Sequence, residues 1–431
     1  MKEGVLERRQ LVVEGNIWKA LLFLAVPVAI NNFFNASYDL IDTFFVSSIG
    51  SIELGGTSLI GREIGREKYE KGKHISLQLL FTAGILGVLI TLICFIYSNE
   101  ILLKAHATDS LLSVADIYFK LTVLSTPLIF INSSYVAIKR ANADTLKSMN
   151  INFIAIILKI ITTYFLIFHF NMGIISLAIS TFIGSIFVSI YAIYDLFIKN
   201  TMMKLSYNKF KFDKKILSLL FIMGIPIILE KSSISFSFII VNKYILNYGE
   251  TVLAAYGITN KINSLIFSTV TGFGTGLATI VSQNLGADQA ERAREGIKKA
   301  FIIAITTSAV IISIILLSKY SIAGLFAKDD KELLRHTVNA MSVYSISIIP
   351  WAVFQVVIGV FEGTGNTKMN LLISIARVYL FRLPLVIILS NFAMLQEYSI
   401  WYAMLLSNIF TGIFALILYL RNYKRLVLYG E

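Results

Sequence analysis

The stretch ATIVSQNLGADQAERAREG, residues 278–296, decides the fold because the chain contains a second version of it. The second version is TSLIGREIGREKYEKG, residues 57–72, in which Gly65 takes the place of Gly286. Two versions of one stretch, so far apart in the chain, indicate that the sequence repeats itself.

Another pair of stretches, KRANADTLK and FEGTGNTKMN, is aligned at Thr145 and Thr367. Thr145 follows Gly65 by 80 residues, and Thr367 follows Gly286 by 81. One proline lies 18 residues before the first threonine, and another lies 17 residues before the second. Markers that stay in step indicate an internal duplication of about 200 residues, the kind of repeat from which alternating-access transporters are built.

The chain is too apolar for a water-soluble fold. Its 431 residues are 56% hydrophobic and 15% charged, against about 45–50% and about 25% in soluble domains. The apolar residues form blocks of about 20 or more, long enough to cross a hydrocarbon core of roughly 30 Å as helices. We therefore predict an all-α polytopic membrane protein with two pseudo-symmetric helical lobes. Eleven spans are expected, at residues 17–49, 75–98, 118–138, 150–170, 173–198, 216–247, 253–282, 300–318, 338–361, 371–392 and 399–420.

The formal net charge of +12 orients the chain in a membrane and does not indicate a nucleic-acid partner. Lys and Arg gather in alternate short connections, at about 199–215, 286–299 and 421–431. Such connections are usually cytoplasmic. The segment 199–215 is the expected linker between a first lobe, residues 1–198, and a second lobe of six helices, residues 216–431.

The first lobe is shorter than the second by about one membrane crossing. Pro27 precedes Gly65 by 38 residues, whereas Pro226 precedes Gly286 by 60, a difference of 22. That length of helix is roughly 33 Å, so we expect five spans in the first lobe and six in the second. With one crossing lost, the basic segment 62–73 falls on the opposite side from the N-terminus. Either the N-terminus is outside, or the long first span doubles back, or the chain carries a damaging deletion.

Two carboxylates lie inside the first expected span. Asp39 and Asp42 share a helix face with two other polar residues, Asn35 and Tyr38. A charged side chain at mid-membrane costs at least about 2.5–3.5 kcal/mol, so it normally faces a cavity, a partner or a cation. Two acids three residues apart resist joint ionisation, which favours protonation of one of them near neutral pH. The alternative is that one of these acids forms a structural ion pair with Lys159.

The second lobe also has charges inside its apolar spans. Glu230 follows Pro226 by four residues. A Glu230 that faces a cavity would attract a cationic substrate, and an interfacial position beside Lys231 is the alternative. We interpret Arg377 and Arg382 as structural, because a guanidinium group is well suited to hold carbonyls or carboxylates between helices.

Several motifs resemble those of the multidrug and toxic compound extrusion (MATE) family. They are YDLIDTFFV in the first span and, in the second lobe, AAYGITNKI, GFGTGLATIV, VSQNLGADQAERAREG, FEGTGNTK and LFRLPL. The resemblance runs over nearly the whole chain except the missing crossing. It implies twelve spans in two six-helix lobes, a V-shaped central cavity, and export of cationic or amphipathic compounds in exchange for Na⁺ or H⁺.

The resemblance also implies a cation-coupling site in the first lobe. Tyr38 and Asp42 match the first-span pattern, and Asp42 takes the position of the family's acidic residue, with Asp39 beside it. A second acid is expected four residues after an asparagine, where this chain has Thr163 and Lys159. The candidate residues of the substrate cavity are Asn35, Glu230, Lys159 and Thr163.

These features together predict a secondary antiporter in a bacterial or archaeal inner membrane. We expect no cofactor besides the coupling H⁺ or Na⁺, and a monomer whose partners are the lipid bilayer and a small-molecule substrate. The alternatives are a flippase for lipid-linked saccharides, which Lys159 leaves open, and a deletion-inactivated paralogue that does not transport. An enzyme is disfavoured because the sequence has no P-loop and its four histidines lack metal-ligand spacing.

Overall fold

The computed structural model contains helices and no strands in the residues that it describes, which are 3–24, 55–104, 109–173, 175–199, 203–206, 210–327 and 330–423. The first group of helices comprises α1 (Glu3–Val13), residues 17–24, residues 55–65, α4 (Tyr69–Ile96), α5 (Ser98–Lys104), α6 (Asp109–Leu124), α7 (Thr126–Ala141), α8 (Thr145–Phe168), α9 (Ile175–Ile193) and a π-helical turn, η1 (Tyr194–Ile198). The second comprises α10 (Lys214–Leu246), α11 (Glu250–Gly286), α12 (Ala290–Ala327), α13 (Lys331–Tyr344), η2 (Ser345–Ser347), α14 (Ile348–Gly363), α15 (Thr367–Ile375), η3 (Ala376–Arg382), α16 (Leu383–Ser390), η4 (Ala393–Leu395) and α17 (Tyr398–Tyr423).

Nine helices within these ranges are long and apolar enough to cross a membrane. They cover residues 69–96, 116–141, 145–168, 175–198, 250–286, 290–327, 331–363, 367–390 and 398–422. These nine correspond to expected spans, and a tenth expected span coincides with α10, which is 33 residues long. Most of the remaining one, 17–49, lies outside the described residues. The prediction of an all-helical polytopic membrane protein is confirmed.

Two spans break next to a proline at equivalent points of the repeat. α6 ends at Leu124, and α7 begins just before Pro127, which occupies its first turn. In the second lobe, η2 separates α13 from α14, and Pro350 lies in the first turn of α14. A proline is tolerated in a first turn because the N–H that it lacks would have no partner there. Pro226, in contrast, lies inside the continuous helix α10.

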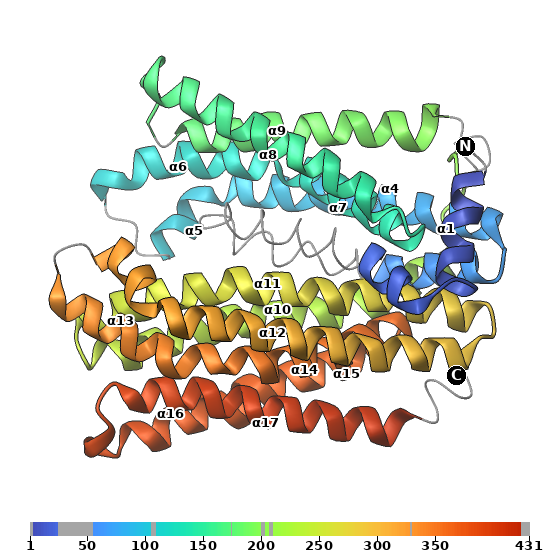
Figure 1. The fold of residues 1–431 in the computed structure, drawn as a ribbon. Helices are drawn as coiled ribbons and strands as arrows, with labels where there is room; N and C mark the ends of the chain where they lie inside the picture. The colour runs from blue at the N-terminus through green and yellow to red at the C-terminus, as the bar shows by residue number, and fades with distance from the viewer. Residues whose placement is uncertain are drawn as a thin grey trace.

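Buried apolar side chains form two main clusters, one in each group of helices. The larger includes Phe354 and Trp401 of the second group, together with Val12 and Leu24 from the start of the chain. The smaller is centred on residues of α4, α7 and η1, such as Tyr135. Figure 1 shows α4–α9 on one side of the molecule and α10–α17 on the other.

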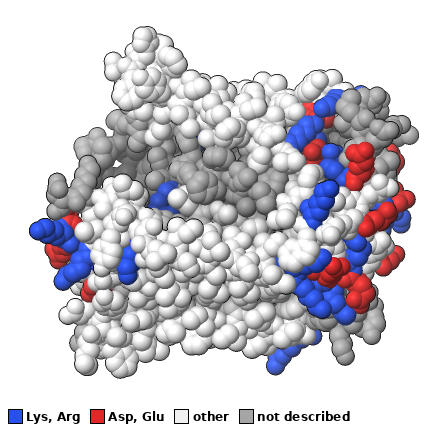
Figure 2. Space-filling view, in the orientation of Figure 1, with Lys and Arg blue, Asp and Glu red and all other residues white. Residues whose placement is uncertain are grey.

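The described chain begins and ends at the same end of the bundle (Figure 1). On the face drawn in Figure 2, most charged side chains gather there, so we call it the charged end. The basic connections meet at this end, where Gln78 Nε2 donates a hydrogen bond of 2.6 Å to the carbonyl oxygen of Lys211. The first turn of α4 therefore lies beside the linker between the two groups.

The N-terminus also lies at the charged end, on the same side as the basic segment 62–73. Arg9 of α1 donates a hydrogen bond of 3.0 Å to the carbonyl oxygen of Gly65. The alternative in which the N-terminus lies opposite this segment is therefore wrong. The residues that would have to reconcile the two positions, 25–54, lie outside the described part of the chain.

Equivalent turns of the repeat share an uncommon backbone conformation. Glu67 and Asp288 have φ angles of 61° and 57°, and Ala143 and Gly365 have φ angles of 56° and 79°. This left-handed region costs a residue with a Cβ roughly 1–2 kcal/mol, so it is rarely adopted without a reason. The duplication seen in the sequence is therefore preserved in the detailed shape of the turns.

Candidate functional site

The two lobes meet at the charged end through the two glycines that the repeat aligns. A Cβ on Gly65 would lie 2.2 Å from the carbonyl oxygen of Gln283 and 3.0 Å from the Cα of Gly286. A Cβ on Gly286 would lie 2.3 Å from the carbonyl oxygen of Arg62. Only glycine allows the helix at residues 55–65 to cross the end of α11 so closely. The crossing brings the lobes into backbone contact at this end.

Hydrogen bonds between the lobes flank the crossing in a pseudo-symmetric pair. Ser58 Oγ donates to the carbonyl oxygen of Gly363 at 3.3 Å. Thr279, which the repeat makes equivalent to Ser58, donates through Oγ1 to the carbonyl oxygen of Arg140 at 3.4 Å. Both acceptors lie in the last turn of a helix, where carbonyl groups have no partner within the helix. Each lobe thus satisfies a helix end of the other.

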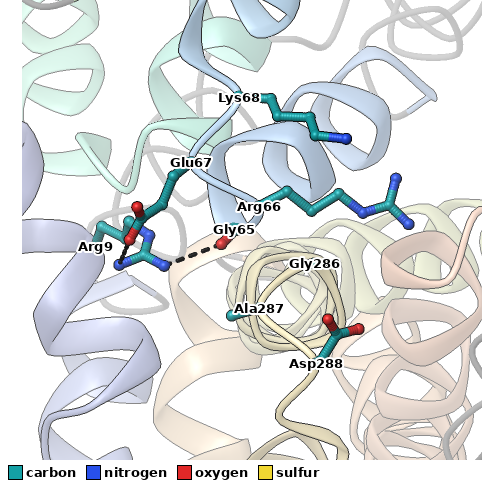
Figure 3. Close-up of a pocket in the computed structure, with 8 residues that line it drawn as sticks. All are labelled: Arg9, Gly65, Arg66, Glu67, Lys68, Gly286, Ala287 and Asp288. Atoms are coloured by element: carbon teal, nitrogen blue, oxygen red, sulfur yellow. Dashed lines mark hydrogen bonds and ion pairs between the residues drawn. The ribbon is translucent and has the colours of Figure 1, made fainter.

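A pocket of about 410 Å³ lies where α1 meets this crossing. It is lined by Arg9, Gly65, Arg66, Glu67, Lys68, Gly286, Ala287 and Asp288 (Figure 3). The guanidinium group of Arg9 reaches from α1 to the turn after residue 65, where it also pairs with the Glu67 carboxylate at 3.1 Å. The pocket therefore draws its walls from α1 and from both lobes.

Away from the charged end, the face drawn in Figure 2 is hollowed between the two groups of helices. A bundle closed at one end and hollowed toward the other resembles a transporter whose central cavity opens away from the closed end. Four residues predicted to face such a cavity lie outside the described part of the chain, so their grouping stays a prediction. They are Asn35, Tyr38, Asp39 and Asp42.

The structure places two other predicted residues together on α8. Lys159 and Thr163 are half-buried and lie one turn apart. Gly184 of α9 faces them, and a Cβ added there would lie 3.8 Å from the Cβ of Lys159. The hydroxyl oxygen of Thr163 is buried and has no hydrogen-bond partner among the described residues, so it can serve as an oxygen ligand or donor. Glu230 belongs to α10 in the other group, and its side chain lies outside the described part.

The sequence reasoning missed an ionic cluster buried in the first lobe. Asp195 of η1 has a fully buried side chain and pairs with both Lys139 of α7 and Lys147 of α8. The Tyr135 hydroxyl donates to the same carboxylate at 3.3 Å, and Lys139 also contacts Asp144 at 3.6 Å. Both oxygens of Asp195 have cationic partners, so the cluster joins helices and leaves no free acid for transport. A lone acid within an otherwise apolar run was the signal that could have found it.

The second lobe buries its two arginines among aromatic and amide side chains. Arg377, 4% exposed, stacks on the Trp351 ring at 4.5 Å. Arg382, 1% exposed, donates to the amide oxygen of Asn408 at 3.4 Å. These contacts join η3 to α14 and α17, which agrees with the structural interpretation of both residues.

Metal ligands do not gather within the described ranges, where no group of three His, Cys, Asp or Glu side chains is placed to hold an ion. His336, for example, is buried, and its Nδ1 lies 3.0 Å from the Glu397 carboxylate. That contact joins the start of α13 to the start of α17.

Membrane-length helices in two repeat-related groups, joined at one end and hollowed toward the other, define a two-lobed membrane transporter. A family model described as MatE matches residues 51–165 and 226–388, which is more than half of the chain. The chain therefore belongs to the MATE family of transporters.

Curated relatives and solved structures extend this similarity over most of the chain. A Bacillus subtilis protein described as "Probable multidrug resistance protein YoeA" is 24% identical over 383 residues, which cover 86% of this chain and 81% of the relative. "Multidrug export protein MepA" of Staphylococcus aureus is 22% identical over 376 residues, covering 82% and 83%. An outward-facing structure of a multidrug resistance MATE family transporter has a TM-score of 0.91 at 20% identity, over 97% of this chain and 98% of the other. A MOP superfamily transporter from Pyrococcus furiosus, described as having a binding pocket of reverse polarity, has a TM-score of 0.90 at 19% identity, over 96% and 98%.

Proposed function

We propose that this protein is a secondary active exporter of cationic or amphipathic small molecules, driven by the entry of H⁺ or Na⁺. The observation that carries the proposal is the joined charged end with a hollow on its other side, in a chain of the MATE family. Relatives described as multidrug export proteins support drug-like compounds as substrates. The two acids of the first span support a cationic group on the substrate or a coupling cation.

The coupling carboxylate in this proposal is Asp42, with Tyr38 one turn earlier as a hydrogen-bond donor and Asp39 beside it. Thr163 occupies the position of the second expected acid, so a Na⁺ site would lack one negative ligand there. Hard cations favour several oxygen ligands including carboxylates, whereas a proton needs a single titrating group. Proton coupling is therefore favoured over Na⁺ coupling.

The experiment is proton-driven efflux of ethidium in everted membrane vesicles that contain the full chain. Asp42→Asn keeps the shape of the side chain but cannot titrate, so we expect efflux to fall at least about tenfold at an unchanged level of protein in the membrane, the upper range of proton-transfer contributions. Thr163→Ala, which removes a neutral hydroxyl group, is the matched control and should retain most of the efflux. Undiminished efflux in Asp42→Asn would reject Asp42 as the coupling acid and direct attention to Asp39.

An inactive paralogue is the second candidate, and one feature of the first lobe favours it. The helix at residues 55–65 is about 16 Å long in its described part, whereas its second-lobe counterpart α11 has 37 residues. A lobe that cannot complete its wall would not hold a substrate or a gradient. No efflux of ethidium by the unmodified protein, with the fold intact, would favour this candidate.

A flippase for lipid-linked saccharides is the third candidate, and Lys159 favours it because a cation in the cavity would attract a pyrophosphate group. Translocation of a fluorescent lipid-linked saccharide across liposomes that contain the protein, lost in Lys159→Gln, would support it. In each of the three cases we propose a monomer in the inner membrane of a bacterium or archaeon, without a cofactor besides the coupling ion.

A further inference from the structure

The short helix α1 lies against the charged end, where it contacts both lobes at once (Figure 1). Export by alternating access requires the lobes to separate at this end when the hollow closes. Any element fastened to both lobes here must let go of one of them. The contacts of α1 differ in kind on its two sides, and this difference indicates which side releases.

The second lobe holds α1 by its C-terminal end. Arg292 of α12 donates to the carbonyl oxygens of Val12 and Glu14, each at 3.3 Å, and to that of Gly15. Asn284 of α11 donates to the carbonyl oxygen of Val12 at 3.1 Å. Carbonyls in the last turn of a helix have no partner of their own, and a cation there also interacts favourably with the helix dipole.

Apolar packing adds to this attachment. Val12 is fully buried and belongs to the core cluster of the second lobe, against which Leu11 also packs. Gly296 of α12 lies close to the chain just after α1, since a Cβ there would be 3.7 Å from Ile17 Cγ2. Separating α1 from the second lobe would expose these side chains and leave several carbonyls unsatisfied.

The first lobe holds α1 only through polar side chains in the contacts that the structure shows. Arg9 donates to the Gly65 carbonyl oxygen at 3.0 Å and pairs with Glu67 at 3.1 Å (Figure 3). Arg8 contacts Asp144 at 3.6 Å. The Glu67 side chain is 65% exposed, and ion pairs that face water are broken at little cost because water replaces the partner.

We propose that α1 is a releasable latch of the transport cycle, formed by residues 3–15, in which Arg9 and Arg8 are the residues that open and close. The latch stays on the second lobe through Arg292 and closes the charged end by binding the turns after residues 65 and 143 of the first lobe. Its contact at Gly65 lies directly on the crossing of the two lobes, so forming it stabilises the closed arrangement. Releasing it exposes no apolar side chain that the first lobe covers in these contacts.

The experiment measures closure of the charged end without any substrate. A reporter, Ser58→Cys, is placed in a Cys94→Ser background, because Ser58 is 6% exposed and bonds across the lobe interface. Everted vesicles expose the charged end to an impermeant maleimide. Arg9→Ala should raise the labelling rate of the reporter roughly three- to tenfold, the effect of losing one charged hydrogen bond and one exposed ion pair.

The matched control is Arg294→Ala, which removes an arginine of α12 whose pair with Glu291 lies within the second lobe. It should leave the labelling rate unchanged. The charge exchange Arg9→Glu with Glu67→Arg should restore slow labelling in part. Equal rates for Arg9→Ala and the unmodified latch, or an equal rise in Arg294→Ala, would overturn the proposal.

A cross-linking pair covers the case in which Arg9→Ala disturbs folding. A bifunctional maleimide that joins Arg9→Cys to Glu67→Cys should stop ethidium efflux, whereas one that joins Glu14→Cys to Arg292→Cys should leave it running. Equal inhibition by both cross-links would also overturn the latch. This second readout depends on the proposed export function, but the labelling readout does not, so failure of export and failure of the latch are distinguishable.

Discussion

The first lobe encloses its helices less completely than the second. In the most apolar 18 residues of the helix at 145–168, 11% are buried, against 39% in its second-lobe counterpart at 367–390. The spans at 116–141 and 331–363 show the same order, with 50% and 67%. This difference agrees with a first lobe shortened by about one crossing. It teaches that the two halves of a duplicated fold can hold their helices together by different forces.

The first lobe relies on charge at the charged end, where Asp195 joins three helical elements through two lysines. The second lobe relies on packing, with Arg377 and Arg382 embedded among rings and amides. Substitutions matched between the lobes can separate these two ways of holding helices together.

The largest effect is expected from Asp195→Leu, because it leaves Lys139 and Lys147 buried without a counter-charge. Breaking a buried ion pair by removing one partner costs about 3–5 kcal/mol in the free energy of unfolding. Denaturant unfolding of the purified protein in detergent would measure it. Asp116→Asn, which breaks a more exposed pair with Lys120, should cost less than about 1 kcal/mol. Similar losses for the two variants would contradict a special role for the cluster.

A smaller loss is expected from Gly65→Ala, which forces the lobes apart at their crossing. The new Cβ would lie 2.2 Å from the Gln283 carbonyl oxygen, a backbone atom that cannot turn away. Overpacking of this kind costs about 1–3 kcal/mol. Gly84→Ala on α4 is the control, because the nearest atom to its Cβ would be 4.0 Å away. There the substitution should stabilise the helix by up to about 1 kcal/mol, and thermal unfolding in detergent distinguishes the two signs.

The smallest effect concerns the two equivalent left-handed turns. Gly365→Ala places a Cβ at a φ of 79° and should destabilise the protein by about 1 kcal/mol. Ala143→Gly relieves the same strain in the first lobe, where φ is 56°, and should be neutral or stabilising. Thermal midpoints of the two variants measured side by side test this, and a loss in both would show that Ala143 is not strained.

The repeat and the spans could be predicted from sequence because both are local or periodic signals. Apolar blocks report helix length directly, and Pro127 and Pro350 mark where spans break. The Asp195 cluster could not be predicted in this way, since its partners lie 48 and 56 residues away in the chain and meet only when helices pack.

The position of α1 was also beyond the sequence. Counting crossings assigned a side to the N-terminus, but the contact between Arg9 and Gly65 depends on how the first lobe accommodates its shortened segment. The coupling role of Asp42 rests on the family resemblance and stays a prediction, because residues 25–54 lie outside the described part.

The separation of the lobes at the charged end can be measured directly by distances between spin labels. Labels at the exposed residues Lys68 and Lys298, one in each lobe, would be attached in a Cys94→Ser background and compared with labels at Lys298 and Lys368 within the second lobe. We predict two distance populations for the first pair, with a ratio that changes with pH, and a single constant distance for the second pair. One unchanging distance for the Lys68 and Lys298 pair at every pH and with ethidium added would contradict a two-lobed transporter that opens at this end.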